Sequence, residues 1–334
     1  MSESSSSSIP FQRDRFLSEL RRKAPFSNPS TLSGIGDDTA VVQYGEHLQL
    51  LTTETLIEGI HFDLTYFPVK HLGYKAAVVS FSDVYAMNGY PGQLMVSLAL
   101  SSKMTSEWLD LFFEGVLAAC TEHGVDLAGS NLTPSLTGFC INMSVVGEAE
   151  KSRLVYRNGM KEGDLLCVTG DLGAAYLGLQ VLEREKRLFE RDNSFTPVLE
   201  GYDYVIGRQL KPSARKDIID YFAAEKLVPT AMTQLSSGLA HGVQSLCLAS
   251  GVGCRLYEHK IPIAGESLRV ASELHQSPQV AALHGGQDFE LLFSVRPDCY
   301  EPLLRQGDIS ILGHAVAEKE GVTLFAESGE QISL

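Results

Sequence analysis

Basic residues are scarce in this chain, and their scarcity excludes one large class of partners. The 334 residues include 27 Lys and Arg against 41 Asp and Glu, which gives a formal net charge of −14 at pH 7. Proteins that bind nucleic-acid backbones use Lys and Arg to neutralise phosphates. We therefore expect no nucleic-acid partner, and a function that handles phosphates would need divalent cations or a few local basic side chains.

The chain also shows no CxxC spacing, no apolar segment typical of a signal peptide near residue 1 and no long uninterrupted apolar run. Its six cysteines have no CxxC spacing and no histidine cluster nearby, so we expect buried reduced thiols rather than a zinc site. Residues 1–8 are Ser-rich and read as a frayed tail. Polar residues, Gly and Pro interrupt the uncharged segment 127–147. These absences predict a cytoplasmic protein without membrane contact.

What the chain does have is an alternation of helical and strand patterns, with no internal repeat. A hydrophobic content of 44% and the chain length suggest a globular protein of about two domains. The polar segment 148–164 is the expected boundary, which gives domains 1–150 and 151–334. This alternation predicts a mixed α/β layer fold. Helices are expected at 11–23, 72–87, 106–123 (capped by Ser106 and stopped by Gly124) and from about 174 to 186, and strands at 39–43, 48–53, 93–100, 139–146, 165–168, 254–257, 289–295 and 309–312.

Two glycine-containing loops are candidates for phosphate chemistry. The run Gly34-Ile35-Gly36-Asp37-Asp38 combines a tight backbone with two carboxylates, which are ligands that Mg²⁺ prefers, although an ordinary turn is an equal alternative. Residues 170–173 (GDLG) join a predicted strand to a helix, where a phosphate can bind at the helix N-terminus. Their spacing fits neither a P-loop nor a dinucleotide fingerprint, which favours a plain tight connection.

Six motifs follow one another along most of the chain: GIGDDTAVV (34–42), TTETLIEGIHF (52–62), GYKAAVVSFSDVYAMNGYP (73–91), SSGLAHGV (236–243), SGVGCRLYEHKIPI (250–263) and HGGQDFELLF (284–293). Together, and in this order, they resemble the thiamine-monophosphate kinase family, within the aminoimidazole ribonucleotide synthetase superfamily. The resemblance implies two α/β domains: an N-terminal ATP- and metal-binding domain whose strands form a β-barrel with a second subunit, and a C-terminal sheet covered by helices.

The resemblance also implies a reaction and its participants. ATP would donate its γ-phosphoryl group directly to the phosphate of thiamine monophosphate, with Mg²⁺ as cofactor, no protein nucleophile and a homodimeric enzyme. Since both reactants are anions, in-line positioning and charge neutralisation would supply most of the catalysis.

The family's functional residues map onto positions of this chain by motif. The metal ligands implied are Asp38, Thr52, Thr53, Glu54, Asp83, Asn131, Gln234 and Ser237. The nucleotide contacts implied are Ser130, Asn131, Arg157 and Ser236, and the substrate contacts are His61 and Gln287. Read without the family, Arg157 would be a surface arginine, His61 an isolated histidine at a strand end and Ser236 a helix cap.

Several of these positions depart from the family pattern. The family has Asp at the position of Glu54, GlyGlyAsp at 129–131 (here GSN), Asp at the positions of Gln234 and Ser237, and Glu at the position of Gln287. Two hypotheses follow: a working kinase that relies on Asp38, Asp83 and Glu54, or a catalytically impaired relative that binds nucleotide or thiamine phosphate as a sensor or partner subunit. A selenophosphate synthetase is disfavoured, because no cysteine precedes Cys120.

Overall fold

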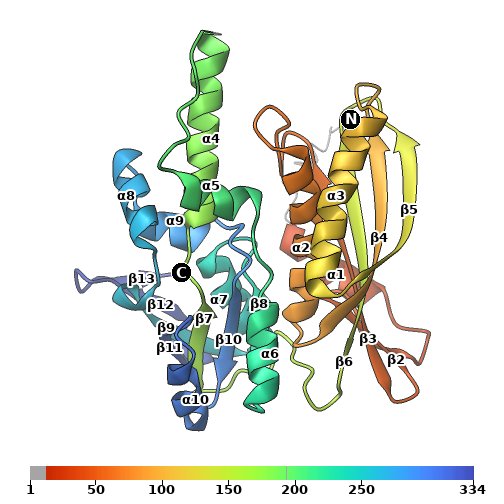
Figure 1. Ribbon diagram of the computed structural model, residues 1–334. Coiled ribbons are helices and arrows are strands. Elements are labelled where there is room, and N and C mark those ends of the chain that lie inside the picture. The colour runs from red at the N-terminus through yellow and green to blue at the C-terminus, as the bar shows by residue number, and fades with distance from the viewer. Residues whose placement is uncertain (1–12, 193) are drawn as a thin grey trace, which may run out of the picture.

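The fold consists of two β-sheets, one in each half of the chain, with helices packed around them. The computed structural model describes residues 13–192 and 194–334, so the tail expected at residues 1–8 and the start of the helix expected at 11–23 lie outside the described residues. Figure 1 shows the N-terminal half, coloured red to yellow, beside the C-terminal half, coloured green to blue.

The N-terminal sheet is open at both edges. Within the described residues its strands run in the order β1 (Thr31–Ser33), β2 (Ala40–Tyr44), β3 (His47–Ile57), β6 (Cys140–Ala149), β4 (Tyr90–Leu100) and β5 (Asp126–Pro134). Only β4 and β5 pair in parallel. The barrel expected from the resemblance is therefore not closed within one chain.

Alternation along β3 separates the two faces of this sheet, as the period-two pattern predicts. Leu48, Leu50 and Leu56 are buried on the helix-covered face, whereas Leu51 and Thr53 are exposed on the other face. The predicted end of this strand at Thr53 is wrong, because β3 continues to Ile57 and Glu54 lies inside it. The edge strand β5 was not predicted, since its Gly, Ser, Asn and Thr content lacks the usual strand signal.

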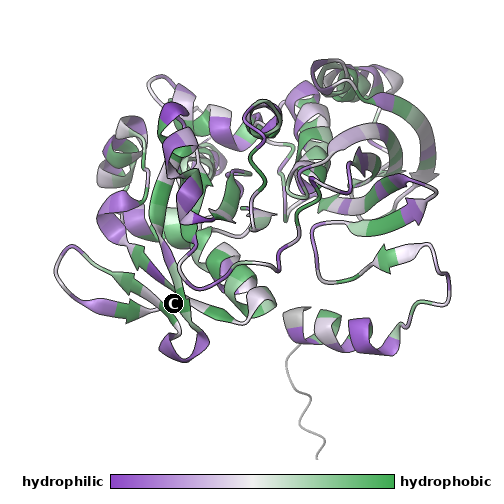
Figure 2. Cartoon of the chain, turned by 90° about the horizontal axis from the view of Figure 1, so that it is seen from below, coloured by the Kyte–Doolittle hydropathy of each residue, from purple (hydrophilic) through white to green (hydrophobic). Residues whose placement is uncertain are grey.

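Two helices cover the buried face, α2 (Val69–Tyr85) and α3 (Ser106–His123), and the short α1 (Arg13–Lys23) lies at the periphery (Figure 2). The crossing of α2 and α3 is close: a Cβ added to Gly73 would lie 2.0 Å from the Phe112 carbonyl oxygen. Gly124 ends α3 in the left-handed conformation, as predicted. The predicted cap Ser106 is wrong by one residue, because Thr105 Oγ1 accepts the bond from the Trp108 N–H at 3.2 Å.

The C-terminal sheet is almost entirely antiparallel. Its described strands run in the order β13 (Gln331–Ser333), β12 (Val322–Phe325), β9 (Val252–Tyr257), β11 (Ile309–Ala317), β7 (Leu165–Thr169), β10 (Leu291–Val295) and β8 (Ala231–Gln234). The helices of this half are α4 (Ala174–Arg191), α5 (Asp203–Leu210), α6 (Lys216–Ala224), α7 (Leu239–Ser250), α8 (Gly265–Glu273), α9 (Pro278–His284) and α10 (Tyr300–Arg305).

One hydrophobic cluster extends through both halves. It joins α2 and α3 to side chains of the C-terminal part such as Ile218, Phe222 and Phe293, all of which are completely buried. The chain crosses between the sheets within residues 150–164, after β6 and before β7. The proposed division at residue 150 stays a prediction, but the shared core shows that the two halves are firmly packed together.

No disulfide is formed among the cysteines of the described residues. All six cysteines are free thiols, four of them buried. Among the described residues, no helix combines the length and apolarity that crossing a bilayer requires.

Candidate active site

Asp38 of the acidic loop is buried and held by an arginine from the segment between the sheets. Its side chain has no exposed surface, and its two oxygens accept bonds from Arg157 Nη2 at 2.7 Å and Nε at 2.9 Å. Thr233 of β8 donates a further bond to Asp38 Oδ1 at 3.2 Å. The carboxylate of this loop therefore connects the N-terminal half to the C-terminal sheet.

The neighbouring Asp37 completes this cluster from the other side of the arginine. Its carboxylate accepts the backbone N–H of Asp38 at 3.0 Å and that of Arg157 at 3.2 Å. Burial, and secondarily the charge of Asp38, raise the pKa of Asp37 to about 6. A carboxyl group that resists ionisation in this way favours a cation or a proton nearby.

Asp83 projects from α2 toward the same region and lies against β3 and β8. Asp83 Oδ2 accepts a bond from Thr52 Oγ1 at 2.7 Å, and Oδ1 accepts one from Gln234 Nε2 at 3.3 Å. Burial raises the pKa of Asp83 well above its usual value, and the charges of Glu54 and Asp38 raise it further. The structure therefore brings the carboxylates of Asp38, Glu54 and Asp83 into electrostatic contact across three separate sequence motifs.

A cavity of about 160 Å³ lies beside these carboxylates, where β3 faces the loops of the C-terminal half. The sequence assigned six of its lining residues to the site: Glu54, His61, Gln234, Ser236, Ser237 and Gln287. A second cavity of about 340 Å³ shares His61 and Gln287 with the first and extends between the 59–66 loop and α4. Together the two cavities offer a polar end near the carboxylates and a wider compartment beyond it.

His61 stands at the junction of the two cavities in a defined tautomer. Its Nδ1 accepts the Ile57 backbone N–H at 3.0 Å, so in the neutral ring the proton is on Nε2. Burial lowers the pKa of His61, which keeps the ring neutral near pH 7. The neutral imidazole can therefore donate one hydrogen bond toward a ligand.

Thr53, one of the implied metal ligands, turns its side chain away from this cluster. Thr53 alternates with Thr52 and Glu54 along β3, so its hydroxyl lies on the outer face, where it accepts bonds from Asn142 and Ser144 of β6. The hydroxyl of Thr53 is therefore not part of the cluster. Its backbone remains beside Thr52, because both belong to the same strand.

The structure leaves Ser130 and Asn131 apart from the other site residues of the same chain. Both lie on the edge strand β5, three strands from β3, which corresponds to roughly 14 Å at the usual strand spacing. Glu54 of β3 pairs with Met143 of β6, Met143 with Val96 of β4, and Val96 with Ser130 of β5. Ser130 therefore lies on the same helix-covered face of the sheet as Glu54. Asn131 therefore lies on the opposite face, paired with Ser97.

Ser236 does not cap α7, although a helix cap was its alternative interpretation. The cap position is Gly238, without a side-chain bond. Ser236 instead lines the smaller cavity, and its carbonyl oxygen accepts the Gln287 N–H at 2.9 Å.

The donor set of the site fits a divalent cation in part. Two carboxylates, Glu54 and Asp38, are close enough to raise the pKa of Asp83, and the buried Gln234 Oε1 has no hydrogen-bond partner. Yet both oxygens of Asp38 and both of Asp83 already accept bonds from protein donors. Within residues 13–192 and 194–334, no group of three or more His, Cys, Asp or Glu side chains is arranged as a ready metal centre.

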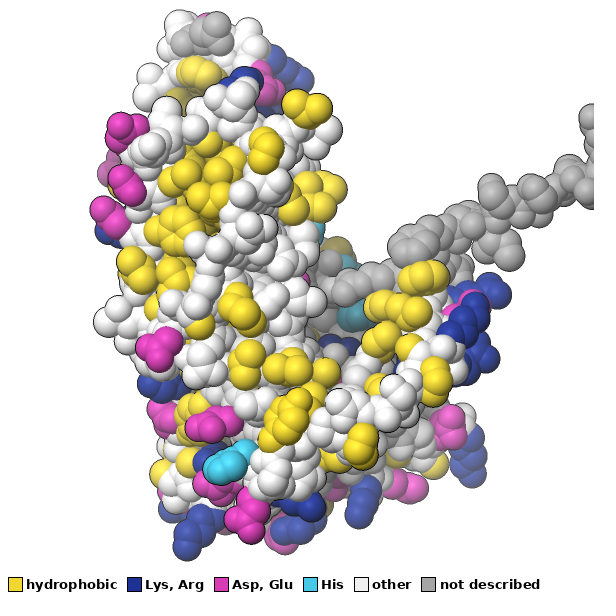
Figure 3. Space-filling view, turned by 90° about the vertical axis from the view of Figure 1, so that its right-hand side faces the viewer, with side chains coloured by type: hydrophobic (Ala, Val, Ile, Leu, Met, Phe, Trp, Pro, Cys, Tyr) yellow, Lys and Arg dark blue, Asp and Glu magenta, His cyan; other side chains and the backbone are white. Residues whose placement is uncertain are grey.

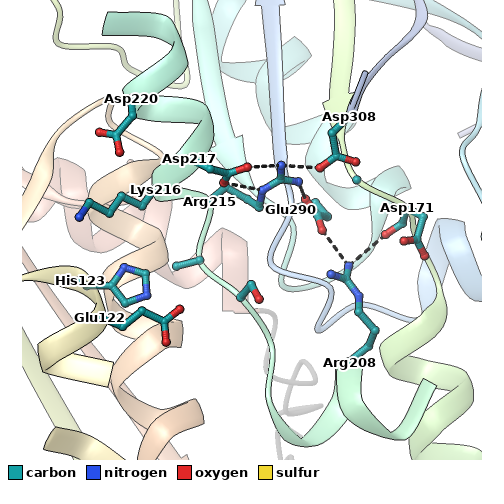
Figure 4. Close-up of a pocket in the computed structure, with 13 residues that line it drawn as sticks. Glu122, His123, Asp171, Arg208, Arg215, Lys216, Asp217, Asp220, Glu290 and Asp308 are labelled. Atoms are coloured by element: carbon teal, nitrogen blue, oxygen red, sulfur yellow. Dashed lines mark hydrogen bonds and ion pairs between the residues drawn. The ribbon is translucent and has the colours of Figure 1, made fainter. Parts of the chain in front are cut away.

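A larger cavity of about 540 Å³ lies elsewhere, between α3, the start of α6 and the end of β7 (Figure 4). It is lined by none of the residues that the family motifs assign to the site, although Gly170 and Asp171 of the glycine-containing 170–173 loop reach it. Its arginines already have partners: Arg208 and Arg215 both bind the buried Glu290, at 2.8 and 2.6 Å. We place the candidate site at the smaller cavity, because six of the residues that the family motifs predict line it and because Gln234 in its wall donates to the buried Asp83.

Sequence reasoning missed one contributor to this site. Thr233, which binds Asp38, is a buried strand residue with no distinctive signal other than its position beside Gln234. Asp37 was recognised as a carboxylate of the acidic run, but the family motif gave it no role of its own.

Comparisons with known proteins identify the family of this chain. Residues 36–149 match the family described as AIR synthase related protein, N-terminal domain. The chain is 35% identical over 288 residues to the thiamine-monophosphate kinase of Aquifex aeolicus, covering 86% of this chain and 88% of that one. The corresponding Bacillus subtilis protein is 31% identical over 274 residues, covering 82% and 80%. The solved complex of AaThiL with AMPPCP and TMP matches with a TM-score of 0.80 at 29% identity, covering 98% of each chain. The chain therefore belongs to the thiamine-monophosphate kinase family.

Proposed function

We propose that this protein transfers the γ-phosphoryl group of ATP to the phosphate of thiamine monophosphate, producing thiamine diphosphate. The observation that carries the proposal is the convergence of Asp38, Glu54 and Asp83 beside a cavity lined by both halves of the chain. The named relatives, and a structural neighbour solved with AMPPCP (an ATP analogue) and TMP, support the same reaction.

Magnesium is the cofactor that this donor set suits best. Asp38, Glu54, Asp83 and the orphaned Gln234 Oε1 would hold it, since Mg²⁺ takes oxygen ligands and uses few protein carboxylates alongside substrate phosphates. When bound, it would neutralise charge on the phosphate groups.

The protein's own groups would orient the two anions. Arg157 holds Asp38 with a guanidinium fork that also suits phosphate oxygens, so we propose that it contacts the nucleotide when ATP enters. The neutral His61 would donate from Nε2 to the substrate, and Gln287 would contact the substrate from the other side of the junction. Ser236 would contact ATP, and the nearby Ser237 would supply a hydroxyl oxygen to the metal.

The alternative is a catalytically impaired relative that binds nucleotide or thiamine phosphate as a sensor or partner subunit. One observation favours it: the protein alone satisfies the oxygens of Asp38 and Asp83, through Arg157, Thr52 and Gln234. An ion would have to displace these donors. The neutral residues at 131, 234 and 237 reduce the charge available to attract it.

Product formation separates the two functions. Purified protein with ATP, Mg²⁺ and thiamine monophosphate should release thiamine diphosphate, measured by chromatography. D83N should lower turnover at least about 100-fold, because it removes the central carboxylate. D298N, which removes an exposed carboxylate from the turn Pro297–Cys299, away from both site cavities, is the matched control and should keep wild-type turnover.

The impaired-relative hypothesis predicts a different pattern. No product would form, while ATP or thiamine monophosphate would still raise the melting temperature, because a ligand that binds only the folded state stabilises it. Installing Asp together at positions 54, 131, 234 and 237 should then create turnover if the missing carboxylates are limiting.

A homodimer would resolve the isolation of the β5 residues. Because β5 is an open edge of its sheet, a second subunit could pair with it and bring Ser130 and Asn131 to a site formed between subunits. The side of the molecule that carries α3, β4 and β5 displays many hydrophobic side chains (Figure 3), and Met95, Leu132 and Leu136 are exposed on these two strands and the loop that follows them. Sedimentation analysis should give twice the mass of the chain.

The cytoplasmic location expected from the unpaired cysteines stays a prediction.

A further inference from the structure

The segment of residues 285–290, which joins α9 to β10, has an unusual backbone at the wall of the candidate site. Gly286, Gln287 and Phe289 have φ values of +71°, +65° and +55°. For the two residues with side chains this left-handed conformation costs about 1–2 kcal/mol each. Contacts with the surrounding structure must therefore hold the segment in place.

The strained residues line the site and are bonded to the chain segment that follows β8. The N–H groups of Gln287 and Phe289 donate to the carbonyl oxygens of Ser236 at 2.9 Å and Leu235 at 3.0 Å. Both side chains line the cavity of about 160 Å³, and Gln287 also lines the cavity of about 340 Å³. A small shift of this segment would consequently move Gln287 relative to any bound substrate.

Asp288, between the two strained residues, is directed into the C-terminal half instead. It is 1% exposed, and its carboxylate accepts the N–H groups of Gly173 at 2.9 Å and Ala175 at 3.3 Å. These groups belong to the start of α4, whose own cap position is Gly173 and has no side chain to offer. Asp288 therefore supplies a cap from 115 residues away, where a negative charge also suits the helix dipole.

Glu290 anchors the far end of the segment in the same manner. Its carboxylate binds Arg208, Arg215 and the Thr169 hydroxyl, as Figure 4 shows for the two arginines. Two buried carboxylates thus alternate with two strained residues that face the site.

We propose that Asp288 is a positioning residue that fixes Gln287 in the conformation facing the substrate, by tying the segment to the N-terminus of α4. Asp288 lines neither site cavity, so it acts through its neighbour. The substrate side of this inference rests on the proposed function, whereas the positioning itself does not.

A double-mutant cycle with D288N and Q287A tests the substrate side. The assays run at about pH 8.5, because burial raises the pKa of Asp288 to about 7 and the carboxylate must be ionised. D288N should raise the KM for thiamine monophosphate about 10-fold and leave the KM for ATP within about 2-fold. In the Q287A background, D288N should change the KM for thiamine monophosphate less than about 2-fold. Additive effects would overturn the proposal.

Amide hydrogen exchange tests the positioning without any ligand. D288N should speed exchange in residues 285–290 about 10-fold, because the bonds to Ser236 and Leu235 loosen. T105A, which removes the cap of α3, is the matched control and should leave this segment and the turnover unchanged. Faster exchange confined to the start of α4 would reduce Asp288 to a helix cap and overturn the proposal.

The two experiments distinguish a failure of the proposed function from a failure of the proposed role of Asp288. A wild-type protein without turnover refutes the proposed function, while the exchange measurement still decides the role of Asp288. If D288N does not fold, D288E, which keeps the charge and adds one methylene, takes its place in both experiments with the same expected non-additivity and faster exchange.

Discussion

Replacing Arg157 with Met is the sharpest perturbation of the candidate site. The substitution removes two charge-assisted bonds, of 2.7 and 2.9 Å, from an Asp38 side chain that has no exposed surface. Breaking one partner of a buried ion pair costs about 3–5 kcal/mol, because the remaining charge stays buried without compensation. Since the Arg157 side chain is 27% exposed, we expect the lower end, about 3 kcal/mol.

Calorimetry in the presence of EDTA measures this loss. At roughly 2–4 °C per kcal/mol, the melting temperature of R157M should fall by about 6–12 °C. Millimolar Mg²⁺ should recover part of the loss in R157M, because the uncovered Asp38 oxygens become available to a cation. The apparent affinity for ATP should fall about 10- to 100-fold if Arg157 also contacts phosphate.

Arg153 provides the matched control for this experiment. It lies four residues earlier in the same segment, donates to the Ile219 carbonyl at 3.3 Å and stacks over the Tyr90 ring. R153M should melt within about 4 °C of the wild type, since it leaves no buried carboxylate uncovered. If R157M melts no lower than R153M and gains nothing from Mg²⁺, the ion pair does not govern the site as argued.

Three further predictions concern pH and packing. Burial and the charge of Asp38 raise the pKa of Asp37 to about 6, so ionising Asp37 lowers the free energy of unfolding of the wild type. Relative to the wild type, the free energy of unfolding of D37N, measured in urea, should rise by roughly 1–3 kcal/mol as the pH increases from about 4 to above 6. Burial lowers the pKa of Lys75 to about 7, so the charged Lys75 destabilises the folded protein fully below pH 7 and no longer does so near pH 10.5. The free energy of unfolding of K75M relative to the wild type should therefore decline by roughly 2–5 kcal/mol between these pH values, measured by unfolding at a series of pH values. G73A places a Cβ 2.0 Å from the Phe112 carbonyl oxygen and should destabilise the protein by at least about 1–3 kcal/mol in urea, whereas G124A, at an open helix end, tests the backbone cost alone.

The sequence by itself determined the local elements and the chemistry that they carry. The alternation along β3, the length of α3 and its glycine stop follow from periodicity and from the preference of glycine for left-handed backbone, and the structure confirms them. The ordered motifs also indicated the family, because glycines and carboxylates at those spacings form a specific combination. The sequence did not predict the edge strand β5, because strand propensity in an exposed polar segment is weak and pairing with β4 decides its conformation.

Only the tertiary structure decided which of those groups meet. The bond between Thr233 and Asp38 joins residues 195 positions apart, and the one between Asp83 and Gln234 joins residues 151 apart. No local pattern encodes such contacts, because they depend on how two sheets pack through a shared core. The same packing paired Arg157 with Asp38 and left Asn131 on the far face of its sheet. Residue identity supplied the carboxylates, and the long-range arrangement of the chain decided their partners, their burial and their charge.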